Sequence, residues 1–523
     1  MTHWIIAPVI LPALLAPIIA FVMRHDFTLA RAASVAGTLA LLAISIGLTI
    51  IAMGGETIAY TLGDWPAPFG IVLVLDRLSA LMVLLTSALA LVVLIHVIAT
   101  KWDEKGRHFH ALFQFQLMGI TGAFLTGDAF NLFVFFEVLL IASYGLMIHG
   151  GGRVRLQAGL QYVVMNLAGS TLFLFALGTL YASTGTLNIA DIAVKLREIP
   201  VEDAALVRVA AILLLVVFAI KAALFPIHFW LPGTYSNAPA PVAALFAIMT
   251  KVGAYAIIRI YTISFGPDLP ATEGLIAQWL MPAAVVTLAV GAVGVLGARR
   301  LMPLLSFSVV GSMGTMMLAV AAFTPYATTS ALYYLVHSTF SAAALFLLAD
   351  LVVTRRAAGD RLTAQLPTVQ NGLFATLFFA GAIGMVGMPP LSGFLGKLVI
   401  LDAIRDSNFM TLGWVAILLG SLLTIVGFAR AGSILFWKST AQVPQEDETK
   451  DEAETEAEPA PKDTPKPATA LELAPTLAAL ALLAVLAGAA GPVTQYLEGA
   501  SAQLYDSSGY ISAVLPAGQE AQQ

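Results

Sequence analysis

The sequence contains no cysteine, and only 11% of its 523 residues are charged. The absence of cysteine excludes disulfide bonds, thiol catalysis and cysteine-ligated iron–sulfur clusters. Soluble globular chains have about 25% charged residues. Here 59% of the residues are hydrophobic, and the mean hydropathy is +0.88. This composition is typical of a protein that crosses a membrane many times.

Motifs that bind phosphate, nucleotides or metals are also missing. The sequence has no Walker-type phosphate loop, no dinucleotide fingerprint and no spaced cluster of metal ligands. Binding of a quinone or of NADH therefore has no residues to support it. We expect no cofactor, no metal, no nucleic-acid partner and no enzymatic activity in this chain.

Long apolar runs predict the membrane topology. A helix needs about 20 apolar residues to cross a bilayer, and on this rule the sequence predicts an all-α integral membrane fold with about fourteen spans. The expected ranges are 4–23, 30–53, 71–99, 109–127, 129–149, 157–183, 206–230, 239–264, 275–298, 302–323, 327–353, 371–401, 411–437 and 469–490. Basic residues gather in alternate loops, beginning with Arg24 and Arg31. The positive-inside rule then places both termini outside.

One stretch does not fit a membrane. Residues 439–468 are acidic, rich in alanine and proline, and free of aromatic side chains. Such a segment cannot bury enough apolar surface to fold alone. It is predicted to be a disordered linker before the last span, and a docking site for a partner subunit is the alternative.

Two spans carry proline where a helix would otherwise continue. The first is LVVFAIKAALFPIHFWLPG, with Lys221 before Pro226, and the second is FFAGAIGMVGMPPLSGFLGKLVIL, with Lys397 after Pro389, Pro390 and Gly393. Proline removes its own N–H and clashes with the carbonyl four residues back, so both helices are expected to break inside the membrane. A pair of interrupted helices in corresponding places points to an inverted-repeat transporter.

Five ionisable side chains lie deep inside predicted spans. A charge there costs about 3 kcal/mol or more, so each is a functional candidate by default. Alternatives stay open: Glu137 could form a structural ion pair, Lys221 could reach an interface, and His337 could be a packed core histidine. Together they form a line of protonatable groups that predicts a lateral proton path with water in the gaps, made of Glu137, Lys221, Lys251, His337 and Lys397.

Two further expectations concern the breaks themselves. His228 lies within the first break and could line water. Lys397 follows the second break, and we expect it to lie against the positive, N-terminal end of the second half-helix.

Four stretches that contain these residues resemble a known family. They are NLFVFFEVLLIASYGL, KAALFPIHFWLPGTYSNAPAPVAALFAIMTKVGAYAIIR, ALYYLVHSTFSAAALF and MPPLSGFLGK. They resemble the proton-translocating antiporter-like subunits, which include the A-type and D-type subunits of Mrp cation/proton antiporters and the large membrane-arm subunits of respiratory complex I. The chain length and the first stretch are most similar to the D-type branch of the family.

The resemblance implies an architecture. It implies an N-terminal three-helix segment (1–108), two inverted five-helix repeats (109–264 and 275–437) and a C-terminal span with a tail (469–523). The acidic linker (439–468), which is predicted from composition, is not a hallmark of the family. It also implies roles: a charge pair of Glu137 with Lys221, a central link at Lys251, a relay at His337 and a terminal group at Lys397.

The resemblance further implies a function. The chain is expected to be the proton-translocating subunit of a multisubunit Na⁺(or K⁺)/H⁺ antiporter in a bacterial plasma (inner) membrane, coupled to cation export. Its expected partners are the Mrp-type antiporter subunits of types A, B, C, E, F and G, protons, Na⁺ or K⁺, and the lipid bilayer. The alternative is a proton-pumping subunit of a complex I-like oxidoreductase or a membrane-bound hydrogenase.

Overall fold

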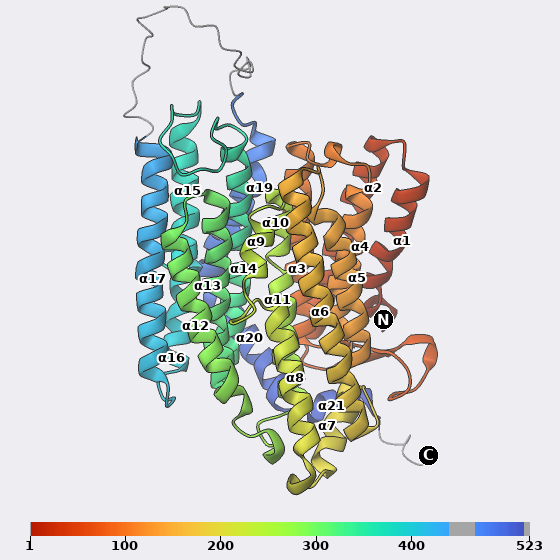
Figure 1. Cartoon of the computed structure of the whole chain (residues 1–523). Helices are drawn as coiled ribbons and strands as arrows, with labels where there is room; N and C mark the ends of the chain where they lie inside the picture. The colour runs from red at the N-terminus through yellow and green to blue at the C-terminus, as the bar shows by residue number, and fades with distance from the viewer. Residues whose placement is uncertain (1, 439–465, 517–523) are drawn as a thin grey trace, which may run out of the picture.

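The computed structural model describes residues 2–438 and 466–516, and within them the chain forms a bundle of long, roughly aligned helices (Figure 1). Most of the predicted acidic linker, residues 439–465, lies outside the described residues. Residue 438 and residue 466 lie at one end of the bundle, and the described N- and C-terminal segments lie toward the other end (Figure 1).

The first part of the bundle, up to the first proline break, contains eight α-helices of very different lengths. They are α1 (Ala7–Pro17), α2 (Phe27–Ala52), α3 (Arg77–Ala99), α4 (Phe109–Leu125), α5 (Ala129–Met147), α6 (Arg153–Thr184), α7 (Ile189–Glu198) and α8 (Ala205–Lys221). The remaining described helices are α9 (Trp230–Tyr235), α10 (Ala240–Phe246), α11 (Met249–Ile263), α12 (Leu275–Gly297), α13 (Leu301–Ala322), α14 (Pro325–Val353), α15 (Asn371–Val386), α16 (Ser392–Ala403), α17 (Met410–Gly432), α19 (Ala470–Gly488), α20 (Ala490–Tyr505) and α21 (Ser508–Val514).

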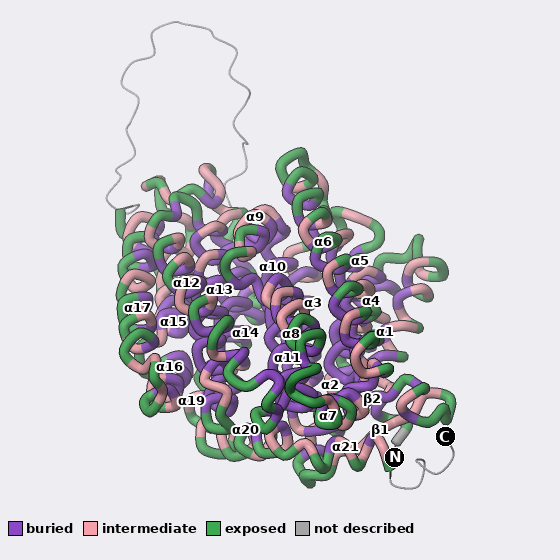
Figure 2. The backbone as a smooth tube through the Cα atoms, turned by 60° about the horizontal axis from the view of Figure 1, so that its bottom comes forward, coloured by how far each residue is buried: buried purple, intermediate pink, exposed green. Residues whose placement is uncertain are grey.

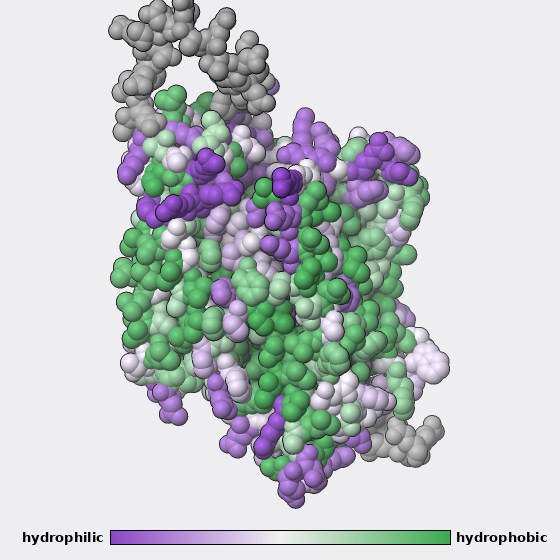
Figure 3. All heavy atoms as spheres, viewed as in Figure 1, coloured by the Kyte–Doolittle hydropathy of each residue, from purple (hydrophilic) through white to green (hydrophobic). Residues whose placement is uncertain are grey.

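The surface of the bundle is apolar in the middle and polar at the ends (Figure 3). Within the described residues, 10 helical stretches are long and apolar enough to cross a membrane, and three shorter apolar helices accompany them. Large apolar side chains such as Phe21, Phe175 and Val293 are more than half exposed. A water-soluble surface does not carry apolar area on this scale. The chain is therefore an integral, multi-pass membrane protein.

The prediction that residues 71–99 form one helix was wrong at its start. Residues Val72–Leu75 form strand β2, which pairs antiparallel with β1 (Ile58–Thr61), with Ile58 opposite Leu75. Helix α3 begins only after Asp76, whose side chain accepts a hydrogen bond from Ser79 N at 2.8 Å. A short apolar run cannot be assigned to helix or strand by periodicity alone, and this N-cap is the local signal that separates the two elements.

The tail after the last predicted span is folded. Helices α20 and α21 follow α19, and α20 packs against α3 and α14 at the end of the bundle opposite residue 438 (Figures 1 and 2). Its buried residues Leu497, Ala500, Ser501 and Leu504 recur every three or four positions. That spacing gives one apolar face directed to the bundle.

Both predicted proline breaks are confirmed. Helix α8 ends at Lys221 and helix resumes only at Trp230, while α15 ends at Val386 and α16 begins at Ser392. A third interruption was not predicted. It lies between α10, which ends at Phe246, and α11, which begins at Met249. The sequence has no glycine or proline at this interruption.

A buried ion pair joins α3 to α11 near the end that carries α20. Arg259 Nη2 donates to Asp76 Oδ1 at 2.8 Å, and a second guanidinium nitrogen binds the other carboxylate oxygen. Each residue is only 2% exposed. Such bidentate pairs are strong and geometrically specific, so this pair fixes the relative position of the two helices.

We predict that Asp76→Asn, which leaves the Arg259 charge buried without a partner, lowers the free energy of unfolding by about 3–5 kcal/mol. Thermal unfolding in mild detergent measures this. The matched control is Asp268→Asn, which removes an exposed pair with Arg197 and should cost less than about 1 kcal/mol. The double variant Asp76→Asn/Arg259→Met should recover most of the loss. A single Asp76→Asn variant as stable as wild type would contradict this account.

Candidate functional site

Helix α6 brings two polar side chains between α5 and α8. Ser170 donates a short hydrogen bond to Glu137 Oε1 on α5, and Lys221 Nζ on α8 donates to Asn166 Oδ1 at 3.3 Å. Residues four apart lie on the same helix face, so Ser170 and Asn166 form one polar edge on α6. The Asn166 side chain is oriented by its own bond to the Tyr162 carbonyl, 2.9 Å away.

The predicted pairing of Glu137 with Lys221 is not a direct contact. Among the described residues, no ion pair within 4.0 Å joins these two side chains. Ser170 binds the carboxylate and Asn166 binds the ammonium. One turn of α6 thus supplies a polar partner to each group, a connection that the sequence did not reveal.

The first break leaves Lys221 at the last position of α8. The chain beyond it is tied down by the indole of Trp230, which donates to the Ile220 carbonyl at 2.9 Å. Gly253 on α11 allows the close approach at this point, because a Cβ there would lie 2.6 Å from Ala222 N. The last carbonyls of α8 accept hydrogen bonds from the chain that follows, including Ala223 N to the Ile220 carbonyl. Lys221 itself is 5% exposed, and its ammonium is bound by the amide oxygen of Asn166 on α6.

Lys251 is the least partnered of the five groups. It is fully buried on α11, and its nearest polar contact is Thr250 Oγ1 at 3.5 Å from Nζ. No carboxylate lies within ion-pair distance among the described residues. An ammonium in this position has little to stabilise it in place.

His337 lies on α14 against the start of α16. Its Nδ1 shares a 2.9 Å hydrogen bond with Ser392 Oγ, while its Nε2 is buried without a partner among the described residues. The imidazole packs over Gly393, where a Cβ would meet the ring at 2.8 Å. One ring nitrogen is thus held and the other is unpaired, as in a group that exchanges a proton.

The expected environment of Lys397 was wrong. The side chain of Lys397 reaches back from α16, and Nζ donates to the carbonyl of Val386 at 2.6 Å and to Ser421 Oγ at 2.8 Å. Val386 is the last residue of α15. The ammonium of Lys397 therefore lies at the negative, C-terminal end of the first half-helix.

A small polar cavity adjoins Lys397. Its volume is about 20 Å³, and Ser308, Ser312, Thr315 and Thr424 line it together with this lysine. A cavity needs about 10–15 Å³ and two to four polar partners to hold one water. The space fits one water beside the ammonium.

Not every predicted residue joins this set. His228 lies in the first break, and its ring stacks on Phe225 with centroids 6.0 Å apart. No described side chain hydrogen-bonds to it, and its Nδ1 is buried without a partner. The structure does not bring His228 into contact with the other candidates. Nor do the described ranges contain a group of three or more potential metal ligands.

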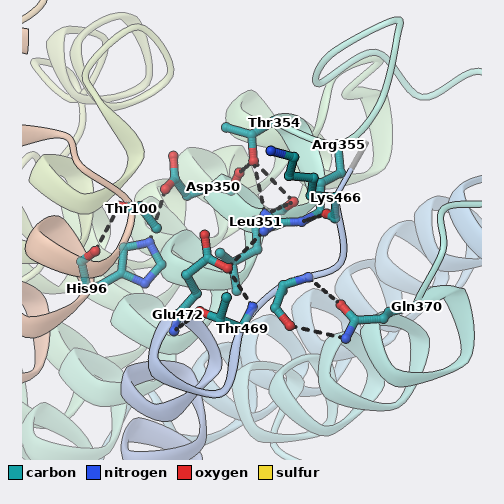
Figure 4. A network of polar contacts seen from close by, with 11 residues as sticks. His96, Thr100, Asp350, Leu351, Thr354, Arg355, Gln370, Lys466, Thr469 and Glu472 are labelled. Carbon is teal, nitrogen blue, oxygen red and sulfur yellow. Dashed lines mark hydrogen bonds and ion pairs between the residues drawn. The ribbon is translucent and has the colours of Figure 1, made fainter. Parts of the chain in front are cut away.

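A second polar network lies near the end of the bundle that carries residue 438, and it was not predicted (Figure 4). His96 Nε2 on α3 lies 3.0 Å from Asp350 Oδ2 on α14, and both side chains are almost fully buried. Just after the end of α14, Arg355 binds Glu472 at 3.0 Å and the Lys466 carbonyl at 3.1 Å. The network therefore fixes α19 to α14. Its residues are far apart in sequence, so only the fold reveals it.

A nearby acid in the α3–α4 loop behaves as a fixed charge. Burial raises the pKa of Asp103, but hydrogen bonds from His110 and Arg31 outweigh burial and lower the pKa to about 2. Arg31 Nε lies 2.5 Å from its carboxylate. Asp103 stays ionised near neutral pH, so it is a structural counter-charge and not a proton carrier.

Known proteins match this arrangement over most of the chain. Residues 126–424 match the family described as NADH:quinone oxidoreductase/Mrp antiporter, TM. The chain belongs to this family. It is 40% identical over 471 residues to the D-type subunit of a probable K⁺/H⁺ antiporter of Rhizobium meliloti (strain 1021), covering 84% of this chain and 87% of the relative. It is 36% identical over 520 residues to the D-type subunit of a Na⁺/H⁺ antiporter of Bacillus subtilis (strain 168), covering 98% and 100%.

A solved structure agrees with these relatives. The fold superposes on a chain of the Mrp complex from Dietzia sp. DQ12-45-1b with a TM-score of 0.86 and 29% identity, covering 98% of this chain and 100% of that one. The resemblance drawn from the four sequence stretches is thereby confirmed.

We predict that Gly393→Ala displaces His337 or separates α16 from α15. The new methyl would clash with the Gly384 carbonyl on α15 and would lie 2.8 Å from the imidazole, and overpacking of this kind costs about 1–3 kcal/mol or more. The control is Gly372→Ala on α15, where a Cβ meets nothing within 4 Å. Thermal unfolding should show a loss for the first variant and none for the second. Equal stability of the two variants would contradict the contact.

Proposed function

We propose that this chain is the proton-translocating, D-type subunit of a multisubunit monovalent cation/proton antiporter, and that it is a transporter subunit and not an enzyme. One observation carries the proposal. Buried or partly buried protonatable groups with hydroxyl, amide and carbonyl partners lie inside the apolar spans of a chain from the antiporter family. Ionisable residues inside a membrane are costly and are most often part of an ion pathway.

In the proposed mechanism, protons move laterally between the two broken helices. Glu137 accepts a proton through Ser170, and the resulting loss of negative charge alters the stability of the Lys221 ammonium beyond Asn166. Lys251 links the two halves. His337 then passes the proton toward Lys397, beside the water-sized cavity that adjoins it. Each step needs intervening water or a side-chain movement, since these groups do not touch one another directly.

We further propose the architecture that this mechanism needs. Fourteen spans would form, with two inverted five-helix repeats at 109–264 and 275–437, each with one broken helix. Support comes from the two interruptions themselves, each of which has a lysine close by: Lys221 is the last residue of α8, and Lys397 binds the last carbonyl of α15. We also propose that both termini lie outside, in a bacterial plasma membrane. The basic loops at the end that carries residue 438 support a cytoplasmic location for that end.

The proposed partners are the other antiporter subunits, of types A, B, C, E, F and G, with Na⁺ or K⁺ as the exchanged cation. The names of the relatives as antiporter subunits support an assembly of this kind. A proton-pumping subunit of a redox enzyme is the second candidate, because the matching family includes NADH:quinone oxidoreductases. Copurifying small antiporter subunits would favour the first, and iron–sulfur or flavin subunits would favour the second.

We predict that Lys221→Ala abolishes cation-driven proton flux in everted membrane vesicles while the complex still assembles. The reason is that alanine cannot carry the positive charge that the proposed pathway requires next to Asn166 and near Glu137. The control is Lys195→Ala, a half-exposed lysine paired with Glu198 outside the bundle core, which should leave flux unchanged. Wild-type flux in the assembled Lys221→Ala complex would refute the pathway.

A further inference from the structure

Four arginines surround one pocket at the end of the bundle that carries residue 438. The pocket has a volume of about 350 Å³, and Arg299, Arg300, Arg361 and Arg430 line it. No acidic side chain lines it among the described residues. We call it the arginine pocket. It lies outside the proton pathway and outside the network of Figure 4.

The backbone builds this cluster from three segments. The α12–α13 turn and the loop after α14 form an antiparallel bridge between Arg300 and Arg361. Two hydrogen bonds flank it, Leu301 N to the Asp360 carbonyl at 2.7 Å and Leu362 N to the Arg299 carbonyl at 3.0 Å. The third segment is the end of α17, where Arg430 donates to the Ala298 carbonyl at 2.5 Å. The arginines are therefore held together by the fold.

The positive charge of the pocket is only partly balanced. Arg300 pairs with Asp360 at 2.9 Å. No described side chain forms a hydrogen bond or an ion pair with the guanidinium of Arg299 or of Arg361. Clustered cations repel one another unless an anion joins them. Arginine forks match phosphate oxygens with paired hydrogen bonds, so the pocket suits a phosphate group.

An apolar surface leads directly to the pocket. Val426 lies one turn before Arg430 on α17 and is 47% exposed, and Leu422 one turn earlier is 53% exposed. Val293 on the neighbouring α12 is 61% exposed. Figure 3 shows hydrophilic side chains gathered at this end of the bundle above a hydrophobic band. A ligand with a phosphate head and hydrocarbon chains fits both surfaces, whereas free phosphate fits only the pocket.

We propose that the arginine pocket binds the phosphate headgroup of an anionic phospholipid, whose acyl chains lie along the exposed faces of α12 and α17. Basic pockets between transmembrane helices near the membrane surface bind such headgroups. The inference concerns a lipid and does not depend on the proposed proton transport.

The test is to purify the intact complex from its native membrane in mild detergent and to quantify bound phospholipid by mass spectrometry. Phosphatidylglycerol and phosphatidylcholine are then added back as probes. Arg299→Ala/Arg361→Ala should bind phosphatidylglycerol about tenfold more weakly than wild type, since two phosphate contacts are lost. The lysine variant Arg299→Lys/Arg361→Lys keeps the charge and should keep most of the binding.

The control is Arg24→Ala/Arg107→Ala, which removes two exposed arginines from the same end of the bundle but from the other half. It should bind phosphatidylglycerol as wild type does. Equal binding by the Arg299→Ala/Arg361→Ala variant would overturn the proposal, as would equal affinity of wild type for phosphatidylcholine.

The same binding assay distinguishes two other possible occupants of the arginine pocket, a free anion and the chain's own acidic segment. Displacement of the lipid by millimolar inorganic phosphate alone would assign the pocket to a free anion and overturn the lipid proposal. Residues 446–463 carry nine acidic residues, and a variant with glutamine or asparagine at these positions tests the chain's own acidic segment as the occupant. If phosphatidylglycerol binds to that variant but not to wild type, the lipid proposal is likewise overturned. Unchanged binding in it supports the lipid.

Discussion

The whole arrangement depends on the cost of placing a charge inside an apolar membrane span. A lone ammonium or carboxylate in hydrocarbon is expelled or neutralised. This chain meets that constraint by ending helices in the middle of the bundle, because a helix terminus supplies backbone groups without partners. Lys221 lies at the end of α8, and Lys397 binds the last carbonyl of α15. The breaks are therefore part of how the charges are held, and not merely points of weakness.

The charged groups in the centre of the bundle have different kinds of partners from the charged groups near its ends. Asp76 with Arg259, and Asp103 with Arg31, form close pairs that hold helices and loops in place. The central groups have neutral partners: Ser170, Asn166, Ser392, Ser421 and the Val386 carbonyl. A tight ion pair resists a change of protonation, whereas a neutral hydroxyl or amide accommodates both states. The contrast separates the paired, structural charges from the central groups that we propose carry protons.

Much of this was accessible from the sequence. Apolar run length located the helices, proline located two breaks, and the rarity of charge inside spans selected the five central residues. What the sequence could not supply depends on packing between distant segments. Ser170 and Asn166 are two of many polar residues on a long helix, and nothing local marks them as neighbours of Glu137 and Lys221. The β1–β2 hairpin was missed because its apolar run also fits a helix, and α20 was missed because its apolar face is short.

The central claim is that Lys251 links the two halves of the proton pathway, and Lys251→Met tests it most directly. Methionine fills a similar volume without the charge, so the account predicts a complex at least as stable as wild type that shows no cation-driven proton flux in liposomes. Stability and flux are measured on the same purified sample. Wild-type flux in the Lys251→Met complex would contradict the account, because protons would then cross between the halves without this group.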